Sequence, residues 1–354
     1  MSGKLDPPHG LELVDFDRLG VWMDGQGLPP GPITGIEQLT GGSQNILVRF
    51  ARGGRHYVLR RPPAFPTADG NETMRREARL LAALAGTPVP HPALIAGCPD
   101  EEILGAAFYL MEPVAGFNPA VGLPELHRSD PAIRHAMGLA MADGIAALAS
   151  VDFTAVGLGD FGRLGRYLER QVARWRSHYD GYALHKGWPG PDSLPDLNAV
   201  ADWLEARRPA AFTPGLMHGD FHLKNVMFRL EGPELAAIVD WELATVGDPL
   251  VDLGWLLATW PDPAEPLAEA QIVVEPWDGF PTAEELIARY AGRSGRDVSA
   301  AGWYHVFACY KLGILLEGTY ARACAGKAPL EIGVRLHRNA VRLLKRAARA
   351  AEAQ

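Results

Sequence analysis

The stretch that decides the fold is His218-Gly219-Asp220-Phe221-His222-Leu223-Lys224-Asn225. Its pattern, H-x-D-x-x-x-x-N, places a carboxylate and a carboxamide five residues apart in one short segment. The carboxylate of Asp220 can accept a proton, and the carboxamide oxygen of Asn225 can bind a hard cation such as Mg²⁺. A single loop that carries both groups is a candidate site for a base and a metal ligand.

A second acidic position follows at Asp240, directly after the apolar run from Ala236 to Val239. A carboxylate at the end of a buried strand is costly unless it is paired or bound to a metal. Asn225 and Asp240, with a hairpin-like stretch between them, would together supply the oxygen ligands that magnesium prefers. The ordered pair is a stronger indication than either residue alone, and two unrelated loop residues would explain it poorly.

The composition is that of a globular protein that can bury a sizeable core. The chain has 354 residues, of which 47% are hydrophobic and 21% are charged, and its length suggests two lobes. A net charge of -8 argues against a nucleic-acid partner. We expect no membrane association, since no apolar run is long enough to span a bilayer. Three widely spaced cysteines favour free thiols and a cytoplasmic location.

Hydrophobic periodicity changes along the chain. A helix over 11–24 precedes short strands at 33–40, 45–50 and 56–61, a helix over 72–86, and strands at 93–97 and 106–114. Helical patterns then dominate over 131–150, 162–179, 199–209, 248–260, 282–292, 298–323 and 331–354, interrupted by a β-like pair at 225–230 and 235–242. This pattern predicts an α+β protein with an N-terminal lobe over residues 1–113 and a mainly helical C-terminal lobe over 114–354.

The segments HGDFHLKNVMF and IVDWELATVGDPLVDLGW carry a family resemblance. They resemble the aminoglycoside phosphotransferase and choline kinase-like family, a branch of the protein kinase-like fold, over nearly the whole chain. The spacing is that of the kinase catalytic loop, so the resemblance implies that Asp220 is the catalytic base and that Asn225 and Asp240 bind Mg²⁺. It also implies structural roles for His218 within the loop and for Asp252 as a brace behind it.

The resemblance places an ATP phosphate loop between the first two strands. Here that loop would be Thr40-Gly41-Gly42-Ser43-Gln44-Asn45, with Gly41, Gly42, Ser43 and Asn45 as candidate contacts. The loop is not G-x-G-x-x-G. Its glycines and serine could present backbone N–H groups to phosphate or simply form a hairpin turn, and the two roles are compatible.

Further nucleotide contacts follow from the same resemblance. A cation on the third strand, Arg60, would pair with an acid on the next helix, Glu77. Arg60 replaces the commoner lysine, as is frequent in the subgroup resembling acyl-CoA dehydrogenase-linked small-molecule kinases, and an arginine changes the geometry of a phosphate contact. Surface charges would be the alternative for either residue alone. The adenine hinge would be Tyr109 to Val114, with contacts from Met111, Glu112 and Val114.

The acceptor is less constrained by the sequence. The spacing of Arg163, Arg166, Arg170 and Arg174 would put four arginines on one helical face, either as a solvated surface or as a site for a carboxylate, a phosphate or coenzyme A. On the late helix, Glu317 and Arg322 are either substrate contacts or an intrahelical pair.

Together these features predict an ATP- and Mg²⁺-dependent kinase that phosphorylates a hydroxyl group of a small molecule. A hydroxyacyl-CoA or a hydroxy acid is the preferred acceptor, and an aminoglycoside or amino alcohol such as choline is the alternative. A catalytically silent nucleotide-binding module is the alternative of another class, although a silent module would not need the complete set of site residues.

Overall fold

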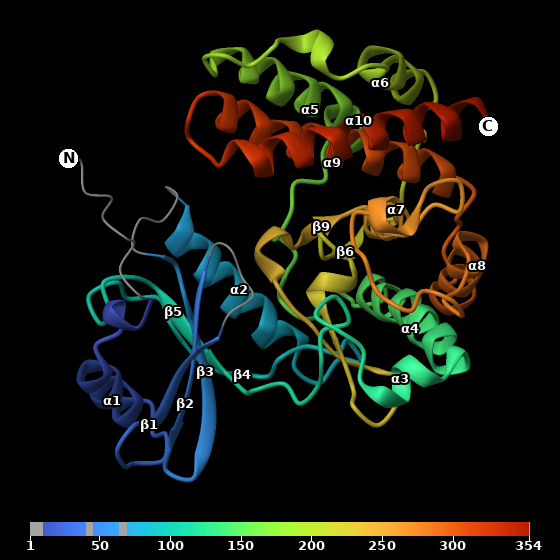
Figure 1. Ribbon diagram of the computed structural model, residues 1–354. Coiled ribbons are helices and arrows are strands. Elements are labelled where there is room, and N and C mark those ends of the chain that lie inside the picture. Colours follow the sequence, from blue (N-terminus) through green and yellow to red (C-terminus); the bar gives the residue numbers. More distant parts are fainter. Residues whose placement is uncertain (1–9, 40–44, 64–68, 354) are drawn as a thin grey trace. The chain divides into compact units, whose positions relative to one another are not determined.

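The structure, a computed structural model, describes residues 10–39, 45–63 and 69–353. Its contacts divide the chain into two compact units. The first comprises Met1–Gly116 and Ala236–Glu242, and the second comprises Phe117–Leu235 and Leu243–Gln354. The first unit therefore includes seven residues, Ala236–Glu242, that the sequence analysis placed in the C-terminal lobe. Each unit is described below by itself (Figure 1).

The first unit is built on a five-stranded antiparallel sheet. Its strands are β1 (Thr34–Leu39), β2 (Ile46–Arg52), β3 (Arg55–Arg61), β4 (Leu94–Cys98) and β5 (Phe108–Met111), in the order β1-β2-β3-β5-β4. The β2–β3 hairpin turns at Gly53 and Gly54, whose φ angles of 55° and 76° suit glycine. The predicted N-terminal antiparallel sheet with a helix is confirmed.

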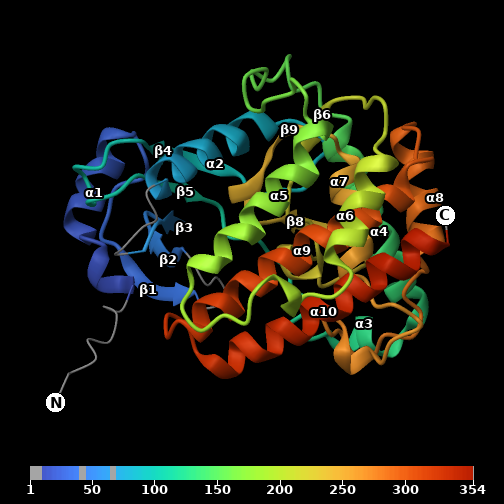
Figure 2. The same ribbon diagram turned by 90° about the horizontal axis from the view of Figure 1, so that it is seen from above.

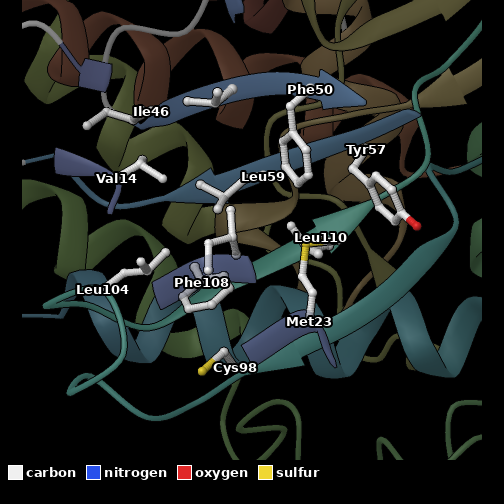
Figure 3. Close-up of a cluster of buried hydrophobic side chains, with 12 residues drawn as sticks. Val14, Met23, Ile46, Phe50, Tyr57, Leu59, Cys98, Leu104, Phe108 and Leu110 are labelled. Carbon is white, nitrogen blue, oxygen red and sulfur yellow. The ribbon is translucent and has the colours of Figure 1, made fainter. Parts of the chain in front are cut away.

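Helix α1 (Phe16–Gly25) contributes Leu19 and Met23 to a hydrophobic cluster with inward-facing residues of the sheet, such as Tyr57 and Leu59 of β3 (Figure 3). The alternation of strand side chains sends Arg60 of β3 to the opposite face, where it meets helix α2 (Gly70–Leu84). The sheet thus separates an apolar face from a face that carries charge.

Helix α1 is shorter than the helix predicted over 11–24. A 3₁₀ turn, η1 (Gly10–Leu13), comes first, and the carboxylate of Asp15 then accepts the backbone N–H groups of Asp17 and Arg18. This N-cap starts a new helix at Phe16, and a cap of this kind separates two segments whose apolar periodicity is continuous.

The second unit is mainly helical. Its helices are α3 (Glu125–Ser129), α4 (Pro131–Ala149), α5 (Gln171–Asp180), α6 (Leu197–Ala206), α7 (Leu250–Thr259), α8 (Ala283–Ser294), α9 (Ala301–Cys324) and α10 (Leu330–Glu352). Helices α9 and α10 lie side by side in both views (Figure 1 and Figure 2). Among the described residues, no helix combines the length and the apolar character needed to cross a membrane.

Three short strands interrupt these helices: β6 (Gly215–Met217), β7 (Val226–Phe228) and β9 (Thr245–Gly247). A further strand, β8 (Leu235–Ile238), lies almost wholly in the segment Ala236–Glu242 of the first unit. Strands β6 and β9 form an antiparallel pair that the sequence did not predict. Three-residue strands are too short to show a clear alternation of apolar and polar side chains. The catalytic-loop motif follows β6 directly, and β9 leads into α7, so this pair positions both segments.

Helix α7 is the buried centre of the second unit. Each of its ten residues is buried, and it packs closely against α9. Gly254 lies so near α9 that a Cβ atom there would sit 2.3 Å from the carbonyl oxygen of Tyr304. At the start of α7 the buried carboxylate of Asp248 accepts a hydrogen bond from the Tyr304 hydroxyl. These contacts hold α7 in one position relative to α9.

The predicted helix over 162–179 is wrong in its first half. Residues 162–167 form a loop, η2 (Leu168–Arg170) follows, and only then does α5 begin. The loop passes β9 so closely that a Cβ atom on Gly162 would lie 2.0 Å from the Val246 carbonyl oxygen. Arg166 has a φ of 53°, which is incompatible with a right-handed helix.

Gly254→Ala should lower the free energy of unfolding by about 1 to 3 kcal/mol, because the added methyl group overlaps the backbone of α9. Gly292→Ala on α8 is the matched control, since a Cβ atom there meets nothing within 4 Å. That control should be neutral or stabilising by up to about 1 kcal/mol. Urea denaturation of both variants measures the difference. Equal stability of the two variants would contradict the close α7–α9 contact.

Candidate active site

The catalytic-loop motif follows β6 and ends in a 3₁₀ turn, η5 (Leu223–Asn225), which leads into β7. Gly219 makes the bend with a φ of 87°, and a Cβ atom there would lie 2.6 Å from the carbonyl oxygen of Leu243. Any other residue at this position would be strained both in conformation and in packing. The backbone conformation of this loop therefore requires glycine at position 219.

Asp252 of α7 holds the loop through its backbone. Its two carboxylate oxygens accept the N–H of His218 at 2.6 Å and the N–H of Gly219 at 2.8 Å. Burial raises the pKa of Asp252 to about 6, although the two N–H donors and the ammonium of Lys311 oppose that rise. Its place in the first turn of α7 favours the ionised form as well. Asp252 is thus a brace behind the loop, as the resemblance implied.

The side chain of Asp220 is held by three donors of the second unit. Asn225 Nδ2 donates to Oδ2 at 3.0 Å, and the indole Nε1 of Trp255 donates to Oδ1 at 2.7 Å. His222 Nε2 lies 3.3 Å from the same Oδ1. Burial alone would raise the pKa of Asp220, but the contact with His222, the charge of His218 and the Trp255 indole lower it overall. The carboxylate is therefore ionised at neutral pH, as a proton acceptor must be.

Asn225 is oriented in a way that suits a magnesium ligand. Its Nδ2 also donates to the backbone oxygen of Asp220 at 2.9 Å, so the amide nitrogen faces Asp220. The carboxamide oxygen Oδ1 is then the group available for a hard cation. In the first unit, the carboxylate of Asp240 supplies oxygens of the same kind. Both residues fit the donor set that Mg²⁺ requires.

In the first unit, Arg60 forms the pair expected with Glu77. Arg60 Nε lies 3.0 Å from Glu77 Oε2, and Arg60 Nη2 donates to Oε1 at 3.1 Å. Tyr109 is the register partner of Arg60 in the neighbouring strand β5, and its hydroxyl donates to Glu77 Oε2 at 2.7 Å. Burial raises the pKa of Glu77, while Arg60 and Tyr109 oppose the rise. All three side chains are buried.

Arg60 also holds Asp240. Its Nη2 donates to Asp240 Oδ1 at 2.7 Å, so one guanidinium joins two carboxylates. Asp240 has a φ of 67°, a left-handed conformation that non-glycine residues adopt mainly where surrounding contacts impose it. Two residues later, Glu242 accepts a hydrogen bond from Asn45 Nδ2 at 3.3 Å. Burial, followed by the charge of Asp240, raises the pKa of Glu242.

The other predicted nucleotide contacts are only partly described. Gly41, Gly42 and Ser43 lie outside the described residues. In the hinge, Met111 ends β5, and the N–H of Glu112 donates to the carbonyl oxygen of Ala93 at 2.9 Å. That amide is therefore in use within the protein, and a contact from Glu112 to adenine would have to come from its carbonyl oxygen. The contact expected between the backbone of Val114 and adenine stays a prediction.

The predicted arginine face does not exist. Arg163 and Arg166 precede the helix, and Arg170 belongs to η2. Arg170 donates to the backbone oxygens of Arg163 and Gly165, so it closes the loop on itself. The spacing of three, four and four residues was a poor guide because the glycines and the left-handed Arg166 break the helix.

Glu317 and Arg322 do not pair with each other. Glu317 is fully buried, and its oxygens accept from Trp188 Nε1 and Ser193 Oγ, each at 2.8 Å, and contact His337 Nδ1 at 2.7 Å. Arg322 donates to Thr319 Oγ1 instead. The prediction of Glu317 as a substrate contact is therefore wrong, since its carboxylate is surrounded by protein donors. Arg322 stays exposed and untested as a substrate contact.

Reasoning from the sequence did not assign the observed contacts of several residues at the site. They are Tyr109, His222, Glu242, Trp255 and Lys311. His222 and Glu242 stood inside the quoted motifs without a role. Trp255 follows Asp252 by three residues on a helix, so it projects from the same face and could have been found by that spacing.

Comparison with known sequences agrees with this geometry. The family model described as "Phosphotransferase enzyme family" matches residues 35–286, which is more than half of the chain. The chain belongs to this phosphotransferase family. The match includes Arg60, Glu77, Asp220, Asn225 and Asp240.

The family also appears among solved structures. A proposed aminoglycoside phosphotransferase from Ralstonia eutropha superposes with a TM-score of 0.80 at 30% identity, covering 96% of this chain and 98% of that one. Aminoglycoside 2'-phosphotransferase-IIIa in complex with GDP has a TM-score of 0.64 at 16% identity, covering 93% and 99% of the two chains, which shows a shared fold. The predicted two-lobed, kinase-like fold class is confirmed.

The curated relatives matched by this chain carry acyl-CoA dehydrogenase names. Acyl-CoA dehydrogenase family member 11 of Gallus gallus is 32% identical over 317 residues, and family member 10 of Mus musculus is 31% identical over 303 residues. The alignments cover 86% and 84% of this chain but 38% and 27% of the relatives. This phosphotransferase therefore corresponds to a part of those longer proteins.

Arg60→Met should lower the free energy of unfolding by about 3 to 5 kcal/mol, because it leaves the buried Glu77 carboxylate without its cation. Adding Glu77→Gln should recover part of that loss by removing the uncompensated charge. Chemical denaturation followed by circular dichroism measures both effects.

Arg55→Met, on the same strand, is the matched control. Arg55 pairs with Glu112 at 3.0 Å, but both side chains are about half exposed, so the expected cost is below about 1 kcal/mol. Similar losses for Arg60→Met and Arg55→Met would contradict a structural role for the buried pair.

Proposed function

We propose that this phosphotransferase is an ATP- and Mg²⁺-dependent kinase that phosphorylates a hydroxyl group of a small molecule. The observation that carries the proposal is the state of Asp220, an ionised carboxylate on a loop whose backbone is bound by Asp252. A base fixed in this way can accept a proton without first reorganising, which lowers the cost of reaching the transition state.

In the proposed reaction, Asp220 orients the acceptor hydroxyl and accepts its proton as the oxygen attacks the γ-phosphorus of ATP. The bond from phosphorus to the bridging oxygen breaks, and ADP leaves with that electron pair. Arg60, held by Glu77, provides positive charge for the nucleotide phosphates. Mg²⁺, when bound by Asn225 and Asp240, would neutralise charge on the phosphate oxygens.

Nucleotide use is supported by proteins of similar fold. Aminoglycoside 2'-phosphotransferase-IIIa has been crystallised with GDP, and APH(4)-Ia with ADP and hygromycin B. ATP is the proposed donor for this chain, with GTP as the alternative for the assay to distinguish. A silent nucleotide-binding module is a weaker proposal, since Asp220, Asn225, Asp240 and Glu77 form a complete set that such a module does not need.

For the acceptor, we propose a hydroxyacyl-CoA or a hydroxy acid. The support comes from the relatives named as acyl-CoA dehydrogenase family members, which connect this domain with acyl-CoA compounds. An aminoglycoside or an amino alcohol is the second candidate, supported by the names of the structural neighbours. A shared fold is weak support for a shared acceptor, because one scaffold hosts many substrates.

The experiment is a transfer assay with γ-labelled ATP or GTP, Mg²⁺ and a panel of acceptors. The panel contains hydroxyacyl-CoAs, hydroxy acids, amino alcohols and aminoglycosides. Asp220→Ala should lower kcat by about 10² to 10⁴-fold with little change in nucleotide affinity, because it removes the base and no phosphate contact. Asn225→Ala and Asp240→Ala should instead raise the Mg²⁺ concentration needed for half-maximal rate.

Each outcome has a distinct meaning. Transfer to hydroxy acids or hydroxyacyl-CoAs that depends on Asp220 supports the proposal in full. Transfer to aminoglycosides alone keeps the kinase and rejects the preferred acceptor. Tight nucleotide binding without phosphoryl transfer to any member of the panel favours the silent module.

A further inference from the structure

Lys311 of α9 occupies an unusual place in the second unit. Its Nζ lies 4.4 Å from the ring centroid of Trp255 on α7 and 5.4 Å from that of Trp175 on α5. Its Nζ also donates a hydrogen bond to the carbonyl oxygen of Gly219, at 3.4 Å. Among the described residues, no carboxylate forms an ion pair with this ammonium. A cation between two indoles is stabilised mainly by the electron-rich ring faces.

Charged groups near Lys311 affect its pKa in both directions. Removal from bulk water lowers the pKa of Lys311 to about 8, the carboxylates of Asp220 and Asp252 oppose this, and Arg174 adds to it. A lysine is rarely kept in such surroundings for packing alone, because an apolar side chain of similar length would avoid the cost of burying a charge. The ammonium therefore calls for a role.

The contacts of Lys311 converge on the base. Trp255 presents its ring face to the ammonium and donates its indole N–H to Asp220 Oδ1 at 2.7 Å. Lys311 also touches the backbone at Gly219, the residue before Asp220. Because neighbouring polar groups polarise one another, a cation on the ring face makes the indole N–H a stronger donor and fixes the plane of the ring.

We propose that Lys311 is a positioning residue, which acts through Trp255 to fix the carboxylate of Asp220 for proton acceptance. The proposal rests on the proposed function, in which Asp220 is the base. It assigns no contact between Lys311 and either substrate. Its signature is a loss of kcat that disappears when the Trp255 indole N–H is absent.

The test is a double-mutant cycle on the full chain. Lys311→Met should lower kcat about tenfold, which corresponds to about 1.4 kcal/mol, while the KM values for nucleotide and acceptor change less than about twofold. Trp255→Phe should also lower kcat, because phenylalanine has no N–H to donate. In the Trp255→Phe background, Lys311→Met should have little further effect.

Two further variants separate positioning from general damage. Lys311→Arg should recover most of the wild-type kcat, since a guanidinium also stacks on indole faces. Lys327→Met, at an exposed lysine just beyond α9, should match the wild type in both kcat and melting temperature.

Three results would overturn the proposal. Additive losses in the double variant would show that Lys311 does not act through Trp255. A raised KM for the acceptor at unchanged kcat would mean that the ammonium binds the acceptor instead. A normal kcat for Lys311→Met would show that the residue has no part in catalysis.

A readout without turnover keeps this proposal distinct from the proposed function. The indole N–H resonance of Trp255 in ¹⁵N-labelled protein, assigned with Trp255→Phe, should shift in Lys311→Met and in Asp220→Asn. In the wild type it should titrate with a midpoint near pH 8, the pKa of Lys311, and this titration should vanish in Lys311→Arg. If no acceptor is phosphorylated yet these shifts occur, the proposed function fails and the Lys311–Trp255–Asp220 coupling stands. A resonance that is insensitive to Lys311→Met refutes the coupling.

Discussion

The second unit depends on the two hydrogen bonds that Asp252 accepts from the backbone of His218 and Gly219. A bend with a left-handed glycine has no regular hydrogen-bond ladder of its own, so its N–H groups need an outside acceptor. One carboxylate serves both groups and so fixes the direction in which the following residue, Asp220, projects. Because Asp252 belongs to a helix buried on every side, the loop inherits the rigidity of the core. Trp255, one turn later, extends this control from the backbone to the Asp220 side chain.

In the first unit the comparable element is Arg60. Its guanidinium joins Glu77 of α2 to Asp240, which returns from a distant part of the sequence. The planar fork of an arginine can serve two carboxylates at once, whereas a lysine offers a single point of charge. An arginine at this position therefore gives this unit a fixed ion pair with carboxylates on two sides. Tyr109 completes the arrangement because its register opposite Arg60 puts it on the same face of the sheet.

Much of the fold could be predicted because its signals are local. Strand β2, which pairs with the strand of Arg60, alternates between buried and less buried side chains, and helix α2 has a regular apolar stripe. The site motif was recognisable because the base and the first metal-ligand candidate lie within eight residues.

The predictions that failed depended on contacts between residues far apart in the sequence. The arginine pattern before α5 looked helical, yet the close passage of Gly162 along β9 prevents a helix there. Glu317 looked free to bind substrate, but donors from residues 188, 193 and 337 surround it. Lys311 gave no sign of its role, since neither indole near it is close in sequence.

The near-contact of Gly254 with the backbone of α9 has a consequence for how this protein can change over evolutionary time. Helix α7 is at once the centre of a hydrophobic core and the support of the reactive loop, so selection on stability and selection on rate act on the same few positions. Substitutions at the contact between α7 and α9 would reduce stability and activity together. The residues at this contact should therefore change slowly during evolution. New acceptor specificities would then arise through changes in segments that do not serve both stability and catalysis, such as the loop before α5 and the exposed face of α10.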